Sequence, residues 1–252
     1  MRLEGKIALV TGGGRGIGRG ISLGLARAGA DVIVNYRRDI EAARETAREI
    51  LGMKRRSVPL QADVSNVEEV EEMIKRVIQD FGKLDILVNN AGIASRGNFV
   101  WNTTVDEYHR VLGVNLHSVF YCSKIALKSM REQKSGHIIN ISSSITLHPE
   151  AGGGPYVVAR AGLEALTQVM AKEERPNNIR VNAVAPGLVE TEMGRRLVRA
   201  TRGLEDIKEL YPSSPFGRVC QPEDIANMVV FLVSEEGSYI TGQVIQVNGG
   251  GS

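Results

Sequence analysis

Short apolar runs alternate with amphipathic stretches along almost the whole chain. The apolar runs predict seven strands, within residues 6–10, 31–36, 57–63, 84–92, 137–143, 179–187 and 243–250. The stretches between them have the spacing of helices, including a long helix from about Val105 to Glu132 and another that begins near Tyr156. Because right-handed crossovers place helices on both faces of a parallel sheet, the alternation predicts an α/β fold with a seven-stranded parallel sheet covered on both faces. A polar stretch from Glu190 to Gln221 falls outside this alternation.

Length and composition narrow the class of protein. The chain has 252 residues, the size of one large α/β domain, so we expect a single domain spanning residues 1–252. Hydrophobic residues make up 42% of the chain and the net charge is only +2, which indicates neither a nucleic-acid nor a membrane partner. Cys122 and Cys220 lack CxxC spacing and the four histidines are scattered, so we predict no disulfide framework and no metal site. Neither a signal peptide nor a membrane span is recognisable, and we expect a soluble, cytoplasmic protein.

The turn after the first predicted strand is rich in glycine, with the sequence TGGGRGIG at residues 11–18. Glycines in this place let the backbone approach a pyrophosphate, whose charge then rests on the free N–H groups of the following helix. The spacing is TGxxxGxG and does not match GxGxxG in any register. A tight turn without a ligand is the alternative, but the position directly after a buried N-terminal strand favours a dinucleotide site.

The end of the second predicted strand indicates which dinucleotide is bound. Sites that prefer NAD usually carry an acidic side chain there, whereas this chain has Tyr36, Arg37 and Arg38. Together with Arg15, the two arginines could surround a 2′-phosphate, because guanidinium groups bind phosphate in a bidentate manner. We therefore predict NADP(H), with NAD(H) as the less favoured cofactor; the alternative is that both arginines are solvated charges beside a helix.

A hydroxyl, a phenol and a cation follow one another in the stretch from Asn140 to Arg160. Ser143 precedes Tyr156 by 13 residues, and Arg160 follows it by four. If Tyr156 lies at the start of a helix, Tyr156 and Arg160 share one helical face, and a cation one turn away favours the ionised phenol. Tyr156 is therefore a candidate general acid and base; the alternative is an ordinary half-buried aromatic residue with a solvated arginine.

These motifs together give the chain a resemblance to the short-chain dehydrogenase/reductase family, from Leu3 to Gly250. The matching motifs are TGGGRGIG at 11–18, Asp63-Val64, NNAG at 89–92, Asn115, Ser143, Tyr156, IRVNAVAPG at 179–187, Thr191 and YITGQVIQVNGG at 239–250. The resemblance implies a doubly wound, Rossmann-like sheet with the strand order 3-2-1-4-5-6-7, and nicotinamide-dependent carbonyl or alcohol chemistry. Tyr156 would give the proton, Ser143 would hold the carbonyl oxygen, and Asn115 would anchor a water chain.

The same resemblance, with the arguments above, predicts the cofactor-binding residues. They are Gly12, Gly14, Arg15, Gly16, Ile17, Gly18, Tyr36, Arg37, Arg38, Asp63, Val64, Asn89, Ala91, Gly92, Tyr156, Arg160, Pro186, Gly187, Val189 and Thr191. One of them departs from the family, whose pattern is Tyr-x-x-x-Lys, because Arg160 stands at the lysine position. Arginine keeps the charge but is bulkier and cannot deprotonate, so the exchange is not conservative.

The resemblance is greatest to the 3-oxoacyl-(acyl-carrier-protein) reductases, and it extends to sugar and secondary-alcohol dehydrogenases. We expect reduction of a ketone or 3-oxoacyl carbonyl to a secondary alcohol, or the reverse reaction. The alternative from another class is a cofactor-binding protein with little turnover, which only Arg160 favours. Two basic positions that would hold an acyl carrier protein align with Lys134 and Asn177, so half of that basic patch is missing. By resemblance, apolar surfaces of the last helix and strand would pair in a homotetramer.

The substrate pocket is expected between two groups of residues. Residues 190–215 would form its roof, and Ile145, Thr146, Leu147 and Leu188 would form its floor. The roof arginines Arg195, Arg196 and Arg199 could attract an anionic substrate, although such charges are more often solvated.

Overall fold

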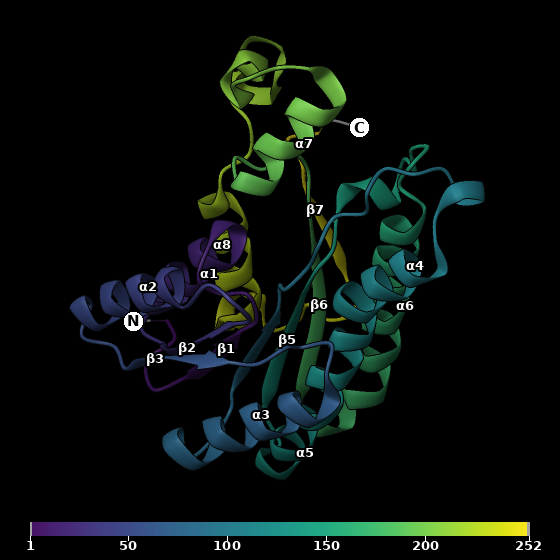
Figure 1. Ribbon diagram of the computed structural model, residues 1–252. Coiled ribbons are helices and arrows are strands. Elements are labelled where there is room, and N and C mark those ends of the chain that lie inside the picture. Colours follow the sequence, from purple (N-terminus) through teal and green to yellow (C-terminus); the bar gives the residue numbers. More distant parts are fainter. Residues whose placement is uncertain (1, 251–252) are drawn as a thin grey trace.

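The computed structural model describes residues 2–250, and it contains one twisted sheet between two layers of helices (Figure 1). The strands are β1 (Ile7–Val10), β2 (Asp31–Tyr36), β3 (Ser57–Gln61), β4 (Ile86–Asn89), β5 (Gly136–Ile141), β6 (Ile179–Pro186) and β7 (Val244–Val247). The helices are α1 (Gly16–Ala28), α2 (Ile40–Gly52), α3 (Val67–Phe81), α4 (Val105–Leu112), α5 (Ser118–Gln133), α6 (Gly154–Glu174), α7 (Glu192–Arg202) and α8 (Pro222–Val233).

All seven strands are parallel, in the order β3-β2-β1-β4-β5-β6-β7. Both the fold class and the strand order predicted from the sequence are confirmed. The chain reverses direction along the sheet between β1 and β4, and a doubly wound sheet binds its ligands at such a switch point, outside the carboxyl ends of the strands.

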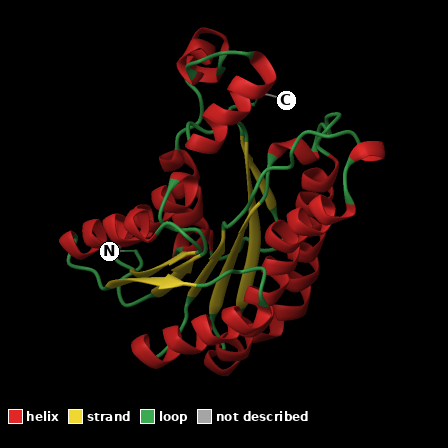
Figure 2. Cartoon of the chain, viewed as in Figure 1, coloured by secondary structure: helices red, strands yellow, loops and turns green. Residues whose placement is uncertain are grey.

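Alternate residues of the strands supply two separate cores. On one face Val10, Val34 and Val88 pack against α1, α2 and α8, and on the other Leu9, Ile33 and Leu87 pack against α3, α5 and α6. Figure 2 shows the sheet enclosed by helices on each side. Because both faces are buried, the strands read as continuous apolar runs rather than as alternating ones.

The long helix predicted from about Val105 to Glu132 is interrupted. Its ends agree with α4 and α5, but residues Gly113–His117 form a π-helical turn between them. A π-helical turn inserts an extra residue but leaves the apolar spacing of each flanking α-helical segment unchanged. The sequence pattern therefore does not reveal the interruption.

The polar stretch after β6 contains a helix that the sequence pattern did not predict. α7 has only two buried residues, Gly194 and Val198, because it covers a small cluster that also includes Ile207 and Leu210. This segment forms a lobe beyond the carboxyl edge of the sheet (Figure 1). None of the helices within residues 2–250 is long and apolar enough to cross a membrane.

Candidate active site

The glycine-rich turn between β1 and α1 is fixed from both sides. Gly12 donates its N–H to Asn35 Oδ1 on β2 at 3.2 Å. On the other side, Thr11 Oγ1 accepts the backbone N–H groups of Asn90 and Ala91 at 2.9 and 3.0 Å. These bonds link the turn to the NNAG segment after β4, so that two motifs about 80 residues apart form one rigid edge.

At two positions of this turn, glycine is favoured for evident steric reasons. A Cβ on Gly18 would lie 2.2 Å from the Gly12 carbonyl oxygen, which no side chain tolerates. Gly16 has a φ of 53°, in the left-handed region. A Cβ at this position would lie 3.4 Å from the Thr191 methyl carbon. Other residues are therefore excluded at position 18 and strained at position 16.

The amino end of α1 is free of the caps found on its neighbours. Asp39 caps α2 and Asn66 caps α3, each by accepting a backbone N–H. At α1 the cap residue Arg15 is extended and, within residues 2–250, has no side-chain capping bond, while the first turn holds no acidic residue. Uncapped N–H groups beside glycines suit a pyrophosphate, and binding of a dinucleotide by Gly12, Gly14 and Ile17 stays a prediction.

The predicted 2′-phosphate arginines differ in their surroundings. Arg37 Nε lies 2.7 Å from Asp63 Oδ2, whereas Arg15 and Arg38 form no ion pair with any other residue in the range 2–250. Burial raises the pKa of Asp63, but hydrogen bonds from Ser65 and the charges of Arg37 and Arg38 outweigh it, and the net shift is downward. Arg37 is thus engaged by a carboxylate, and Arg15 and Arg38 are the available cations.

Three further predicted cofactor residues lie near this edge but are bound into the fold. Val64 is buried in the core on the α3 face. Asn89 is only 4% exposed, and its Nδ2 donates to Asn140 Oδ1 at 2.8 Å and Ser123 Oγ at 3.1 Å. Tyr36 is the last residue of β2 and is half-buried. A direct contact of the Asn89 side chain with a cofactor remains a prediction.

Asn115 lies in the π-helical turn and is completely buried. Its Nδ2 donates to the carbonyls of Ile93 and Val111 at 3.0 and 2.9 Å, and its Oδ1 accepts the Ile93 N–H at 3.1 Å. The turn thereby directs Asn115 toward the segment that follows NNAG. π-Helical turns are frequent at functional sites, which agrees with the predicted placement of Asn115 there.

Tyr156 and Arg160 lie together, one turn apart near the start of α6. The Arg160 guanidinium carbon is 5.0 Å from the centre of the Tyr156 ring, in cation–π geometry. Arg160 is only 5% exposed, so the alternative of a solvated arginine is wrong. Its Nη1 donates to the Ile141 carbonyl at 2.9 Å, while its buried Nε has no partner within the described chain.

Glycine at position 92 makes room for that guanidinium. A Cβ there would lie 2.5 Å from Arg160 Nη2 and 2.8 Å from Asn115 Oδ1. Gly92, Asn115 and Arg160 are therefore immediate neighbours, as a common site requires. The structure thus unites residues from three motifs that are 68 residues apart at most.

Ser143 lies two residues after the end of β5, at the start of a short helical turn. It is partly exposed, and its Oγ accepts only a long bond of 3.4 Å from the Ile145 N–H. Its neighbour Ser142 is 3% exposed and donates to Glu164, so the two serines are not equivalent. The 13-residue spacing that selects Ser143 from the sequence agrees with its greater freedom.

The segment after β6 leads from the sheet into the roof. Pro186 and Gly187 continue β6 beside β7, and a Cβ on Gly187 would lie 3.0 Å from Asn248 Cβ. Val189 is buried in an isolated bridge with Cys220. Thr191 caps α7 by accepting the Gly194 N–H at 3.1 Å, and its methyl group faces Gly16.

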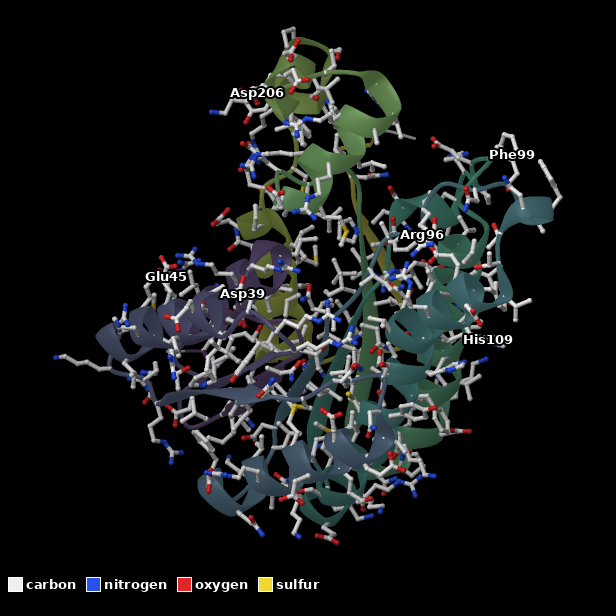
Figure 3. The ribbon with its side chains drawn as sticks, viewed as in Figure 1. Asp39, Glu45, Arg96, Phe99, His109 and Asp206 are labelled. Carbon is white, nitrogen blue, oxygen red and sulfur yellow. The ribbon has the colours of Figure 1, made fainter. Side chains whose placement is uncertain are left out.

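The roof is anchored by Glu190. Glu190 accepts hydrogen bonds from Tyr211 at 2.5 Å and from Gln221 at 3.0 Å, and these bonds, more than its partial burial, set a pKa below the usual range. The three roof arginines pair with acidic residues of the same segment, Arg195 with Glu190, Arg196 with Glu192 and Arg199 with Glu205. Their charge is therefore partly neutralised locally. In Figure 3 Asp206 lies on this lobe, whereas Arg96 lies on the connection after β4.

The four residues expected to form the floor of the substrate pocket do not share one environment. Leu188 packs into the small core of the roof with Val198 and Leu210, and Leu147 is 53% exposed. Ile145 and Thr146 follow Ser143 and are partly buried. Lys134 and Asn177 are adjacent, with Lys134 Nζ 2.8 Å from Asn177 Oδ1.

Several residues that build the site were not selected from the sequence. Thr11 and Asn90 lay within recognised motifs, but Asn35 and Glu164 had no local signal. Their bonds join elements that are far apart along the chain, such as the 23 residues between Asn35 and Gly12. Only the three-dimensional arrangement reveals these partners.

Comparisons with known proteins agree with this geometry. The family described as enoyl-(acyl carrier protein) reductase matches residues 12–252. The chain is 43% identical to 3-oxoacyl-[acyl-carrier-protein] reductase FabG of Staphylococcus aureus (strain N315) over 246 residues, 97% of each protein. Among solved structures, a short chain dehydrogenase from Burkholderia cenocepacia J2315 in complex with NADP superposes with a TM-score of 0.89 and 34% identity, covering 99% of each chain.

A second solved structure, NAD+-bound xylitol dehydrogenase, has a TM-score of 0.92 at 28% identity and covers 99% of this chain and 100% of that one. The similarity in sequence and fold extends over nearly the full length of each protein. The chain belongs to the short-chain dehydrogenase/reductase family and is an enzyme of that kind.

Proposed function

We propose that the protein is an NADP(H)-dependent reductase of ketone or 3-oxoacyl carbonyls. The observation that carries the proposal is the grouping of Tyr156 and Arg160 beside Gly92 and Asn115, at the carboxyl edge where the uncapped end of α1 also lies. The similarity to FabG supports the substrate class.

The proposed roles follow from the chemistry of carbonyl reduction. When bound, the nicotinamide supplies the hydride, and the protein must stabilise the charge that develops on the carbonyl oxygen. Tyr156 donates a proton to that oxygen, and Ser143 donates a hydrogen bond to it. Arg160 lies over the Tyr156 ring and places its positive charge beside the proton donor. Asn115 holds the backbone at Ile93 and thereby the segment that follows NNAG.

Cofactor choice is proposed to rest on Arg38 and Arg15 more than on Arg37. Arg37 would have to leave Asp63 before it could bind a phosphate, whereas the other two cations are available. NADPH is expected to bind more tightly than NADH by about 1 to 3 kcal/mol, the range of charge-assisted contacts. Fluorescence titration of both cofactors with Arg38→Ala and Arg37→Ala measures this. The Arg38 change should remove most of the preference, and equal affinity of the parent protein for both cofactors would contradict the proposal.

The experiment that tests the function measures NADPH oxidation with ketones, β-ketoesters and 3-oxoacyl thioesters. Turnover is expected with at least one class, and Tyr156→Phe should abolish it while NADPH still binds. NADPH binding without turnover on any substrate would instead favour the alternative of a cofactor-binding protein.

The structural neighbour that is a xylitol dehydrogenase makes NAD+ with polyols a necessary comparison. Faster oxidation of a polyol than reduction of any ketone would favour the sugar dehydrogenase alternative.

An acyl carrier protein as partner has weaker support, because Asn177 takes the place of a basic residue and binds Lys134. Cys122 and Cys220 are free thiols, which fits the proposed cytoplasmic location.

A further inference from the structure

α6 presents a third polar side chain on the face that carries Tyr156 and Arg160. Glu164 follows Arg160 by one turn, at the i+4 position. Its Oε1 accepts a hydrogen bond from Ser142 Oγ at 2.5 Å and another from Thr146 Oγ1 at 2.9 Å. Helix α6 therefore holds the loop after β5 at two points, one on each side of Ser143.

Ser143 depends on such neighbours for its position. Its own hydroxyl accepts only the 3.4 Å bond from Ile145, which is too long to fix the loop. Its carbonyl lies 3.0 Å from Thr146 Oγ1, the hydroxyl that Glu164 also binds. The residues on both sides of Ser143 are thus tied to one carboxylate.

The bonds to Glu164 are of a strong kind. Hydroxyl-to-carboxylate bonds are charge-assisted, are typically 2.5–2.7 Å long, and are roughly twice as strong as neutral ones. Glu164 forms no ion pair with a basic residue in the part of the chain that the structure describes, so these two hydroxyls are its partners. An apolar residue on this face could pack against the loop but could not fix both hydroxyls.

We propose that Glu164 is a positioning residue, which holds Ser143 against the same helix that carries Tyr156. Arg160 adds a third tie, because its Nη1 binds the carbonyl of Ile141, two residues before Ser143. The expected effect of Glu164 on turnover rests on the proposed function. The structural part of the inference, the fixing of residues 142–147, does not depend on which substrate is used.

The test compares Glu164→Ala with Glu164→Gln. The glutamine keeps a carbonyl oxygen that accepts both hydroxyls, so it should retain kcat within about threefold. The alanine should lower kcat about 10- to 100-fold, because a displacement of about 1 Å at a reacting group costs up to that factor. The Kd of NADPH should stay unchanged in both. Glu173→Ala, an exposed carboxylate of the same helix, is the matched control and should behave as the parent.

A double-substituted background separates positioning from general stability. With Ser142→Ala and Thr146→Val in place, Glu164→Ala should cause little further loss, since its partners are already gone. A fully additive loss, or an alanine variant with parental kcat, would overturn the proposal.

Hydrogen exchange of residues 142–147 provides a readout that needs no turnover. These amides should exchange faster in Glu164→Ala than in Glu164→Gln. Equal exchange in the two variants would overturn the inference even if the enzyme is active. A parent protein without activity on any carbonyl would contradict the proposed function and leave the exchange result to decide the role of Glu164.

Discussion

At the scale of single residues, Arg160 is fitted to its place in a way that a lysine would not be. The guanidinium lies over the Tyr156 ring, binds the Ile141 carbonyl, and occupies the space that Gly92 leaves open. A lysine has no planar fork to make the first two contacts together. The surroundings of Arg160 therefore suit a guanidinium group.

We predict that Arg160→Ala lowers kcat by about 10- to 100-fold, because it removes the cation that lies over the Tyr156 ring and general acid–base catalysis contributes at least that much. Arg160→Lys should keep kcat within about tenfold, since the charge remains. Steady-state kinetics with NADPH titration measure both, and Lys172→Ala, an exposed cation of α6, serves as the control. If neither substitution at 160 changes the rate, Arg160 does not face the active site.

His137 supplies a second prediction at this scale. It lies on β5 with its Nδ1 buried and unpartnered within the described chain, and burial, followed by the charges of Arg180 and Lys6, lowers its pKa to about 3. Folding lowers the pKa of His137, so between about pH 6.5 and 3 the unfolded chain binds a proton that the folded protein does not. The stability contributed by the neutral histidine is therefore fully present above the unfolded pKa of about 6.5 and is lost as the pH falls toward 3. The thermal midpoint of the parent should therefore drop more steeply between pH 7 and 5 than that of His137→Gln. His109→Gln, at an exposed position, should follow the parent, and a His137 variant that also follows it would contradict the prediction.

At the scale of elements, α1 and α8 approach closely because glycines line their contact. A Cβ on Gly20 would lie 2.7 Å from Pro222 Cβ, and one on Gly24 would lie 2.9 Å from Ala226 Cβ. This contact holds α1, and with it the predicted pyrophosphate cradle, against the layer that leads to β7. The glycines of α1 are therefore packing residues as well as turn residues.

Gly24→Ala is predicted to destabilise the protein by about 1 to 3 kcal/mol, the usual cost of overpacking, although alanine favours a helix. Gly52→Ala is the matched control, because nothing lies within 4 Å of its Cβ position at the end of α2. That change should be neutral or stabilising by up to about 1 kcal/mol. Thermal unfolding compares the two, and an equal or raised midpoint for Gly24→Ala would show that α8 shifts without cost.

Elements with strong apolar patterns could be predicted from the sequence, and those held by long-range bonds could not. β2 has the predicted bounds because four of its six residues are buried. The π-helical turn at Gly113–His117 was not predicted, because the apolar spacing continues on each side of it. α7 was not predicted, because only two of its residues face a core. In the site, spacing selected Ser143 as a candidate, and its role stays a prediction. Glu164 gave no signal, since its partners lie 18 and 22 residues away.

At the scale of the whole molecule, two surfaces of the described chain are candidates for association between copies. β7 is an edge strand that pairs only with β6, and all four of its residues are only partly buried. On the α5 and α6 layer, an apolar hollow is lined by Leu116, Phe120, Tyr121 and Leu166, with Phe120 48% exposed. Exposed apolar edges and hollows favour association between copies.

We therefore predict a homotetramer, in which copies pair about two-fold axes through these two surfaces. Sedimentation at micromolar concentration should give four times the mass of one chain. Phe120→Glu should reduce the assembly to a dimer, because it places a charge in the hollow while β7 remains free to pair. Leu51→Glu is the matched control, since Leu51 is 55% exposed on α2, which lies in the other helix layer. A monomeric parent protein would contradict the prediction, and a Phe120→Glu variant that remains tetrameric would exclude the α5 hollow as an interface.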